Sequence, residues 1–573
     1  MLKNIFITIL LICSVSGVWG QKSVKVKVSG NVITTDGVPA EFINIQLKNT
    51  FYGGTSDGKG YFEFMAPAGQ YTMIVQSIAA HRREFPVTIE EGKENHFADI
   101  EIRENINQLE QVVVTGQFSP QSMRNSLYKV RTVNSEQIRQ KAPTSVQSLL
   151  NTEIGIRLSN DMALGETDFE LMGMSGNNVK ILLDGIPLID RGATKQSLSQ
   201  LDVNSIERVE IVEGPMSVVY GTDALAGVIN IITKKGDGYS EENTWRVGAR
   251  VQEESMGKEY DFFKDKGLHN ESIDLGFNHK SGLFVNGGYT RNNHGGWQGD
   301  LTGREKRWHP KDQALMNGMF GFQNRNMNVW YRLDFLDEKI FGPNNGSELQ
   351  PEKVSDKDFL TKRYTHQLQS DWKLDNRLDV HAALSYQDYK RRTRTTESDL
   401  STGEKWLSSA EASQDITQYK AWIARATVAW NIAPEFSVQP GVEYQWTQGE
   451  GGRIDGTPKV SDLAFFLSAE YKPWEWLSLR PGVRTFIVAD YDAPIAIPSV
   501  LTKFKLTKHM DLRLSYAYGF RSPTLQELYF SFHNDNHDID GNPDLKAEYS
   551  HNITGSVVHE MLFKSIDNKI LIG

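Results

Sequence analysis

Two histidines near the C-terminus have the residue type best suited to chemistry in this chain. His533 and His537 lie in a polar stretch between residues 520–523 ("FRSP") and 542–545 ("NPDL"). Imidazole nitrogens are suitable iron ligands, so this stretch carries side chains that fit an iron-containing ligand. The alternative interpretation is that both histidines are solvated residues of a polar loop.

The sequence lacks the motifs of the common catalytic sites. It contains no G-x-S-x-G, no H-E-x-x-H and no P-loop. His81 and His96 have no neighbour at zinc-ligand spacing. The formal net charge of -10 is not the basic balance of a nucleic-acid binder. We therefore expect no enzyme, no intrinsic metal or cofactor, and no nucleic-acid partner.

Residues 1–20 are predicted to be a secretory signal peptide. Lys3 precedes an apolar run from Ile5 to Val15, and small residues lead to a cleavage point after Gly20. The run is too short to span a membrane as a helix. The only cysteine, Cys13, lies inside this segment, so the mature chain would form no disulfide and no thiolate metal site.

Residues 22–104 show the pattern of a small β-domain. Val24, Val26 and Val28 alternate with polar residues, and Asp36-Gly37 and residues 57–60 supply tight turns. This length suits a seven-stranded sandwich. The string "SDGKGYFEF…PAGQYTM" resembles the carboxypeptidase regulatory-like domain, a β-sandwich that often precedes transporter plugs in Bacteroidetes.

Residues 107–118 contain a short run of β-branched residues between polar flanks. The run is Val112, Val113, Val114 and Thr115. Such a segment can be an edge strand or can be bound by a partner through strand addition. The alternative is an ordinary domain linker.

Residues 119–236 are predicted to form a mixed α/β unit. A helix should begin at Asn134-Ser135-Glu136, and a second short helix should cover residues 146–150. Buried strands are expected at 179–183, 209–212 and 228–233, with a Gly-Pro break and a helical turn before the last one.

The string "LDVNSIERVEIVEGPMSVVYGTDALAGVINIITKK", residues 201–235, closely resembles the plug domain of TonB-dependent receptors. The resemblance implies that residues 107–118 are the TonB box, in which Val112, Val113, Val114 and Thr115 pair with a periplasmic TonB-like energy transducer.

Four charges lie on an otherwise apolar strand of the plug-like region. They are Glu207, Arg208, Glu210 and Glu213. The resemblance implies that they contact the inner wall of a barrel through ion pairs. The alternative is a solvated face of the strand.

In residues 237–573 apolar and polar residues alternate, as they do in membrane β-strands. Ile273, Leu275 and Phe277 alternate with polar residues, and the pattern recurs in segments of about ten residues with turns and long loops between them. Trp474 and Trp476 flank a turn, where an aromatic girdle would meet the bilayer interface. A soluble β-propeller would show regular blade repeats, whereas these loops differ widely in length.

The barrel region is short for this family. It has 337 residues (573 − 236), whereas a barrel of about 22 strands needs well over roughly 400. We expect about 14–16 strands and a C-terminally truncated receptor. The chain would then be mainly β, with an N-terminal β-sandwich in the periplasm, an α/β plug and an incomplete antiparallel β-barrel in outer-membrane lipid.

The resemblance implies active uptake of a scarce nutrient, whose identity the sequence narrows in part. The strings at 520–523 and 542–545 resemble the paired boxes of haem receptors, where a histidine ligates iron, which makes His533 and His537 candidate ligands. Ser522 replaces the usual Ala, however, and residues 119–236 contain no histidine for a second axial position. A ferric siderophore or haem is the preferred ligand, contacting residues 160–177 of the plug. Cobalamin is the alternative, and a glycan is less favoured.

Overall fold

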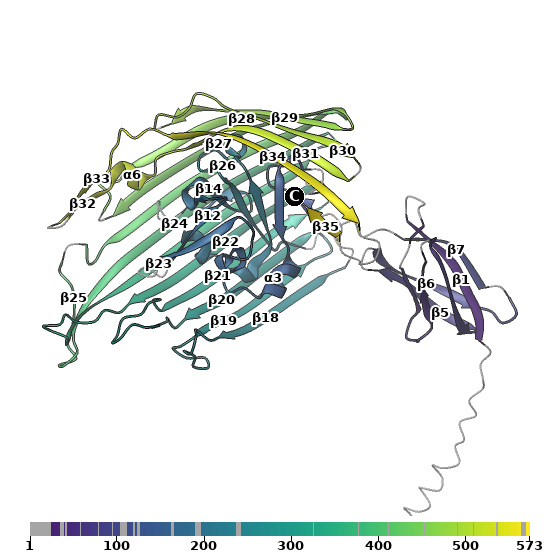
Figure 1. Ribbon diagram of the computed structural model, residues 1–573, viewed down its shortest axis with the longest axis horizontal. Coiled ribbons are helices and arrows are strands. Elements are labelled where there is room, and N and C mark those ends of the chain that lie inside the picture. The colour runs from purple at the N-terminus through teal and green to yellow at the C-terminus, as the bar shows by residue number, and fades with distance from the viewer. Residues whose placement is uncertain are drawn as a thin grey trace, which may run out of the picture. The chain divides into compact units, whose positions relative to one another are not determined.

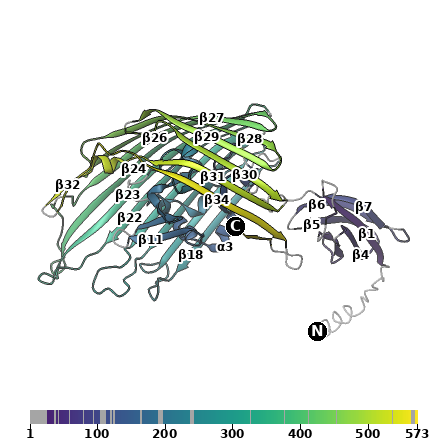
Figure 2. The same cartoon turned by 45° about the horizontal axis from the view of Figure 1, so that its top comes forward.

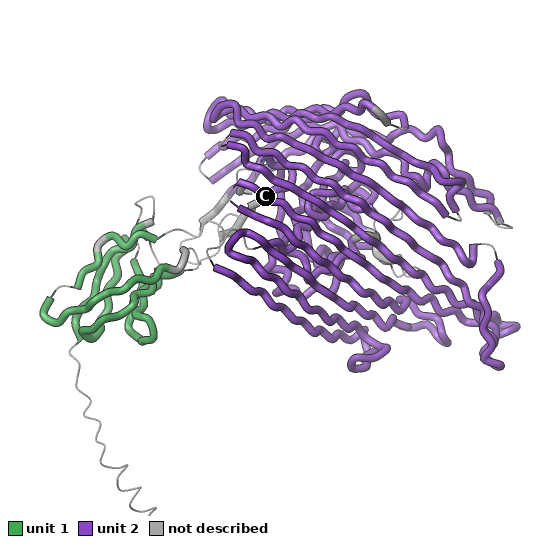
Figure 3. The backbone as a smooth tube through the Cα atoms, turned by 180° about the vertical axis from the view of Figure 1, so that it is seen from behind, with its two compact units in different colours: residues 1–112 green, residues 113–573 purple. Residues whose placement is uncertain are grey.

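The computed structural model describes two compact units, residues 1–112 and 113–573 (Figures 1 and 3). The predicted signal peptide, Cys13 included, lies outside the described residues. The described residues are 25–572 except for 35–38, 41–42, 58, 78–79, 94, 103–111, 119–120, 123–125, 162–165, 190–195, 237–241, 325, 376, 411, 452, 490, 508, 535–536 and 563–568.

The first unit is a seven-stranded sandwich, as predicted. One sheet has the order β4-β1-β7 and the other the order β3-β2-β5-β6. Inward-facing residues such as Val28, Ile45, Phe62 and Met73 share one buried core between them, which the period-2 alternation of the strands makes possible. The strands are β1 (Lys25–Thr34), β2 (Asn44–Leu47), β3 (Gly53–Thr55), β4 (Tyr61–Pro67), β5 (Gly69–Ser77), β6 (Ala80–Ile89) and β7 (Asn95–Ile102).

The second unit begins with the plug, which is built on a five-stranded sheet of order β10-β16-β17-β14-β15. Within that sheet β14 and β17 run parallel and β16 is antiparallel to both of its neighbours. A three-stranded sheet, β11-β12-β13, lies beside it. The plug elements are β8 (Val112–Val113), β9 (Gln121–Ser122), β10 (Lys129–Val133), α3 (Ser135–Lys141), α4 (Val146–Leu150), β11 (Ile156–Asp161), β12 (Glu166–Leu171), β13 (Met174–Ser175), η1 (Gly176–Asn178), β14 (Val179–Leu183), β15 (Ile186–Pro187), η2 (Gln196–Gln200), η3 (Val203–Ser205), β16 (Ile206–Glu213), α5 (Ser217–Tyr220) and β17 (Gly227–Thr233).

Side-chain capping residues set the first turns of the short plug helices. Asn134 caps α3, and Gln137 completes a capping box by bonding back to the Asn134 backbone. Ser145 and Ser148 form the equivalent pair at α4. Side-chain caps of this kind satisfy the free N–H groups of the first turn. The predicted helices at Asn134–Glu136 and residues 146–150 are therefore confirmed.

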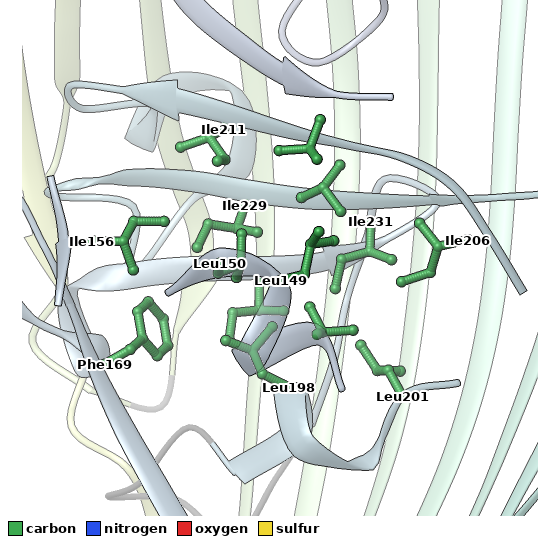
Figure 4. Packing of buried hydrophobic residues seen from close by; sticks show 14 of the residues in the cluster. Leu149, Leu150, Ile156, Phe169, Leu198, Leu201, Ile206, Ile211, Ile229 and Ile231 are labelled. Carbon is green, nitrogen blue, oxygen red and sulfur yellow. The ribbon is translucent and has the colours of Figure 1, made fainter. Parts of the chain in front are cut away.

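The plug has its own hydrophobic core. Figure 4 shows Leu149 and Leu150 of α4 packed against Ile229 and Ile231 of β17, with Phe169 of β12 beside them. All five side chains are buried. Smaller apolar clusters join the plug to the wall, such as Ile186 with Ala383 and Ile423.

The remainder of the second unit is one antiparallel sheet of sixteen strands that curves around the plug (Figures 1 and 2). This agrees with the expected fold class and strand number. Among the described residues the two end strands, β18 and β35, do not pair with each other. The strands are β18 (Thr244–Glu254), β19 (Leu268–Asn278), β20 (Leu283–His294), β21 (Lys311–Gln323), β22 (Met327–Gly342), β23 (Lys353–Lys373), β24 (Leu378–Asp399), β25 (Lys405–Leu407), β26 (Ile416–Ala433), β27 (Phe436–Gly451), β28 (Lys459–Trp474), β29 (Leu477–Ala489), β30 (Ile497–Thr507), β31 (Met510–Arg521), β34 (Glu548–Leu562) and β35 (Lys569–Ile572).

The connections between these strands define two rims. Connections of a few residues, such as 434–435 and 475–476, form a short-turn rim, and long connections such as 400–415 and 522–547 form a long-loop rim. The longest one carries α6 (Leu525–Tyr529) and the hairpin of β32 (Ser531–Asn534) and β33 (His537–Asp540).

The outer face of the sheet is apolar between two aromatic layers. On β26 the outward residues run from Trp422 to Trp430 through alanines and a valine, and both tryptophans are nearly half exposed. An apolar band with aromatic girdles is the lipid-facing surface of a membrane barrel. No helix in the described part of the chain is both long and apolar enough to cross a bilayer.

Gly227 offers a test of the plug packing. Its φ is +151°, and a Cβ there would overlap the carbonyl oxygen of Val212 on the neighbouring strand. Gly227→Ala should therefore destabilise the plug by about 2–4 kcal/mol, measured by urea titration with hydrogen exchange as the readout. Gly318→Ala is the matched control, because a Cβ at Gly318 meets nothing within 4 Å. Equal stability of the two variants would contradict the packing described here.

Candidate functional site

Many barrel side chains donate hydrogen bonds to main-chain oxygens of the plug. Eleven such bonds, of 2.6 to 3.3 Å, join inward-facing Arg, Gln and Asn side chains to plug carbonyls. The pairs are Arg250–Pro143, Gln252–Ala142, Asn292–Thr144, Gln313–Ser199, Arg363–Gln200, Gln367–Leu183, Gln369–Asp184, Gln387–Pro187, Arg425–Val219, Arg480–Gly116 and Arg513–Ser126.

A buried charge cluster of the wall contacts the turn after α5. Glu443 accepts from Arg425 at 2.6 Å and from Arg484 at 2.7 Å. Arg425 also lies over the ring of Tyr220 at 5.1 Å. Gly221 has φ +74°, and a Cβ there would lie 3.0 Å from the Arg484 guanidinium. The glycine therefore lets the plug backbone approach the cluster closely.

The four plug charges predicted to meet the wall pair within the plug instead. Glu207 and Glu210 both contact Arg208, at 3.1 Å and 2.9 Å. Glu213 binds Lys129 and Arg131 of β10, at 2.7 Å and 2.8 Å.

This is a correction to the expected plug–barrel ion pairs. β10 runs antiparallel to β16 and sets Lys129 directly opposite Glu213. The charge of Glu213 is therefore paired within the plug. Glu213 does line a small pocket together with barrel residues Leu501 and Arg513, but its charge partners in the described chain belong to the plug.

Within the segment Val112–Thr115, Val113 and Thr115 are buried, and Val114 and Thr115 are bonded to the plug. Val112 and Val113 form β8, which neighbours β9, and Val113 has no exposed surface. The Glu210 carboxylate accepts from the backbone N–H groups of Val114 and Thr115 at 3.1 and 2.8 Å, and from the Thr115 hydroxyl at 2.5 Å. Asn230 of β17 donates to the same hydroxyl oxygen at 2.9 Å.

The residues that follow are held by both the plug and the wall, near the short-turn rim. The Gly116 N–H donates to the Tyr220 hydroxyl at 3.1 Å, and Arg480 donates to the Gly116 carbonyl at 2.6 Å. Arg480 also lies over the ring of Phe118 at 3.9 Å. Together with Glu210 these contacts form a latch, which we define as Glu210, Asn230, Tyr220 and Arg480 acting on residues 113–118.

A cavity of about 140 Å³ lies at the other end of the plug, near the long-loop rim. It combines apolar walls with hydroxyl, amide and carboxylate groups, and the string "SPTLQ" of the long loop forms one side of it. Its lining residues are Lys180, Ile181, Pro187, Leu188, Ile189, Thr222, Asp223, Tyr419, Gln445, Thr447, Val460, Asp462, Tyr491, Ser522, Pro523, Thr524, Leu525 and Gln526.

The long loop that closes this cavity is bonded to the plug. The Ser522 N–H donates to the Thr222 hydroxyl at 2.7 Å, and the Asp223 N–H donates to the Phe520 carbonyl at 3.1 Å. Arg521 holds α6 in place through Glu527 at 2.9 Å. The sequence singled out residues 520–523, but it gave no indication that they contact the turn after α5.

The predicted histidine ligands do not form a metal site here. Both ring nitrogens of His533 contact carboxylates, Nδ1 with Asp538 at 2.5 Å and Nε2 with Asp540 at 3.0 Å. These hydrogen bonds raise the pKa of His533 above its ordinary value and favour the imidazolium, which has no lone pair for iron. His537 opens β33 and pairs with Asn534. Among the described residues no group of three His, Cys, Asp or Glu side chains could hold a metal ion.

Residues 160–177, predicted to contact ligand, lie in and around β11, β12 and β13. Residues 162–165 are outside the described chain. The described hydrogen bonds of this segment are within the plug, such as the β11–β12 pairing, and they give no further support to a ligand site there.

Three protein families match parts of the chain. The CarboxypepD_reg-like domain matches residues 28–114, the TonB-dependent Receptor Plug Domain matches residues 122–228, and the family described as TonB dependent receptor-like, beta-barrel matches residues 440–568. The three segments follow the order of the sandwich, the plug and the curved sheet.

Individual relatives agree with these families. Vitamin B12 transporter BtuB of Vibrio vulnificus is 32% identical over 139 residues, which is 24% of this chain and 23% of that protein. The chain thus spans less than a quarter of the curated relative it matches. The siderophore receptor PirA of Acinetobacter baumannii has a TM-score of 0.58 at 16% identity, over 77% of this chain and 69% of that one.

The fold is shared with a further solved structure. The ferric enterobactin receptor PfeA of Pseudomonas aeruginosa has a TM-score of 0.57 at 17% identity, over 75% of this chain and 69% of that one. At this identity the likeness concerns the fold, a plug within a curved antiparallel sheet.

The latch predicts that one carboxylate keeps residues 114–115 in place. Glu210→Gln removes the charge that accepts three donors, and charged hydrogen bonds of this kind contribute about 1.5–3 kcal/mol each. The amides of Val114 and Thr115 should exchange at least tenfold faster. Glu207→Gln is the matched control, because Glu207 is exposed and its one charge partner in the described part of the chain is Arg208. Unchanged exchange in Glu210→Gln would contradict the latch.

The His533 contacts predict a pH dependence. Because the folded pKa is raised, its contribution to the hairpin is fully present below pH about 6.5 and is lost as the pH rises through the raised pKa. NMR titration should place His533 above that value, and Asp538→Asn with Asp540→Asn should lower it. A His533 pKa that those substitutions leave in place would exclude the carboxylates as its cause.

Proposed function

This chain belongs to the TonB-dependent receptors of the outer membrane, and we propose that it actively imports a scarce iron chelate, a siderophore or haem. A periplasmic TonB-like energy transducer would drive the uptake. The observation that supports this most directly is a buried, strand-forming segment at one end of the plug and a mixed polar cavity at the other. We assign the chain no catalytic role.

The two rims support an orientation in the membrane. Outer-membrane barrels have short periplasmic turns and long extracellular loops, so the long-loop rim with the cavity would face outward. The latch, near the short-turn rim, would face the periplasm, where the partner and the N-terminal sandwich would lie. A ligand entering from outside would then meet the cavity under α6 first.

One sheet of the plug connects the cavity with the latch. Lys180 and Ile181 of β14 line the cavity and pair directly with Val228 and Ile229 of β17. Asn230, the next residue of β17, bonds to Thr115. We propose that a ligand which displaces β14 shifts the population of residues 112–115 toward release, where the partner adds its strand.

The side chains near the long loop bear on the choice of iron compound. His533 is held by two carboxylates, which disfavours it as a haem ligand and favours a siderophore that brings its own iron ligands. The structural relatives PirA and PfeA are a siderophore receptor and a ferric enterobactin receptor. Cobalamin is the alternative, since the relative BtuB is a vitamin B12 transporter. Nothing in the described chain favours a glycan.

Val113→Pro tests the partner site. Proline removes the N–H that strand addition requires, so uptake should be abolished while ligand binding at the cavity persists. Val113→Ala, which keeps the N–H, is the control and should retain most uptake. Full uptake by Val113→Pro, measured with radiolabelled ligand in whole cells, would exclude this segment as the partner site.

A ligand panel tests the substrate. Purified protein and cells that depend on this receptor are given ferric siderophores, haem and cobalamin, and binding and growth are measured. We expect saturable binding and growth with a siderophore. His533→Ala should leave any haem absorption spectrum unchanged. Growth on cobalamin alone would support the alternative substrate and overturn the iron assignment.

A further inference from the structure

The cavity near the long-loop rim is too small for a whole iron chelate. Its volume is about 140 Å³, and a protein cavity of roughly 150 Å³ holds a group the size of benzene. A chelate that surrounds ferric iron with six donor atoms is several times larger than benzene. The cavity can therefore receive one side arm of such a ligand, while the iron-binding part stays among the long loops.

The walls of the cavity fit an arm that is apolar along most of its length. Ile181, Leu188 and Ile189 of the plug form one side, and Val460 and Leu525 of the barrel region form another. Apolar walls favour methylene groups over groups that must give up bonds to water. An unbranched alkyl chain is the simplest arm with these properties.

One carboxylate in the cavity lacks a close counter-charge. Asp462 of β28 lines the cavity and lies directly opposite Gln445 of β27, which lines it too. Asp462 is only 7% exposed. In the described part of the chain its one hydrogen-bond partner is the Tyr491 hydroxyl, at 3.4 Å, which is longer than usual for an O–H donor. A buried carboxylate in this state gains from a cation that a ligand brings to it.

The cations that attract Asp462 are bound to other carboxylates. Arg484 attracts Asp462 but binds Glu443 at 2.7 Å. Lys180 also attracts Asp462 but pairs with Asp223 at 3.8 Å. Asp223, the other acid of the cavity, thus has its cation within the chain. Asp462 is the carboxylate that is left to meet a ligand.

We propose that the cavity binds an alkylammonium arm of the transported ligand and that Asp462 recognises its charge. The apolar walls surround the methylene groups, and the ammonium group at the end of the arm donates to the Asp462 carboxylate. The transported chelate then carries a primary amine that is protonated at neutral pH. This inference rests on the proposed function, since it names a chemical feature of the ligand that the receptor imports.

The first test uses the arm alone. Butylammonium and butanol, which differ only in their end group, are titrated into the full chain in detergent, and saturation-transfer NMR measures binding against a detergent blank. Asp462→Asn removes the charge with almost no change in size. Asp492→Asn is the matched control, because Asp492 is an exposed acid near Tyr491 that pairs with Lys546. Circular dichroism confirms that each variant keeps its β-structure.

The expected result is that Asp462→Asn weakens butylammonium binding at least tenfold, while Asp492→Asn binds it as the parent does. Butanol should bind the parent more weakly than butylammonium does, and Asp462→Asn should not change its affinity. Asp462→Glu, which keeps the charge, should retain the preference for the ammonium ion. Equal affinity of the parent for the two probes, or equal butylammonium affinity of the parent and Asp462→Asn, would overturn the proposal.

The second test separates this inference from the proposed function. Uptake is measured for the ferric complex of a linear trihydroxamate with one terminal amine, and for the same complex after acetylation of that amine. Uptake of the amine form alone, lost in Asp462→Asn, supports both. Uptake of both forms, unchanged in Asp462→Asn, keeps the function and overturns the inference. Butylammonium binding that depends on Asp462, without uptake of any iron chelate, overturns the iron assignment and with it the iron-bound ligand proposed here.

Discussion

The structure depends on the hydrogen bonds that side chains of the barrel wall donate to backbone oxygens of the plug. The plug has an apolar core of its own, and its surface also presents carbonyl groups to the surrounding strands. A buried carbonyl without a partner costs about 1–3 kcal/mol, and Arg and Gln side chains such as Arg480 and Gln387 supply the missing donors. Because each bond contributes only about 0.5–3 kcal/mol net, the larger values applying to the Arg donors, water can replace it. The plug is thus ordered in place without being permanently joined to the wall.

Hydrogen bonds to the main chain also hold the two ends of the plug, but each end faces a different binding partner. Near the short-turn rim the segment 113–118 is bonded by a carboxylate, a phenol, an amide and a guanidinium, and every one of those bonds ends on a main-chain group or on Thr115. A partner strand would compete for the same main-chain groups. Near the long-loop rim the loop bonds at Ser522 and Phe520 end on the turn after α5. Ligand contact and partner contact therefore act on one domain from its two ends.

Local features of the fold were predictable from the sequence, and tertiary partners were not. Asn134 and the buried run at 179–183 act through neighbouring residues, so their patterns indicated α3 and β14 correctly. The partners of Glu213 depend on which strand lies beside β16, a choice that no local pattern makes. The repeated charge in "KVRTV" was a usable signal, because antiparallel pairing with "VEIVE" sets Lys129 opposite Glu213. The partners of His533 could have been predicted from the sequence, because Asp538 and Asp540 follow it within a single hairpin.

The register of the wall strands is set by both of their faces. On β23 and β24 the inward residues Arg363 and Gln387 bond to plug carbonyls, and their outward neighbours include Tyr364 and Tyr386. A slip of one residue would exchange the two faces, so the register is fixed from both sides at once.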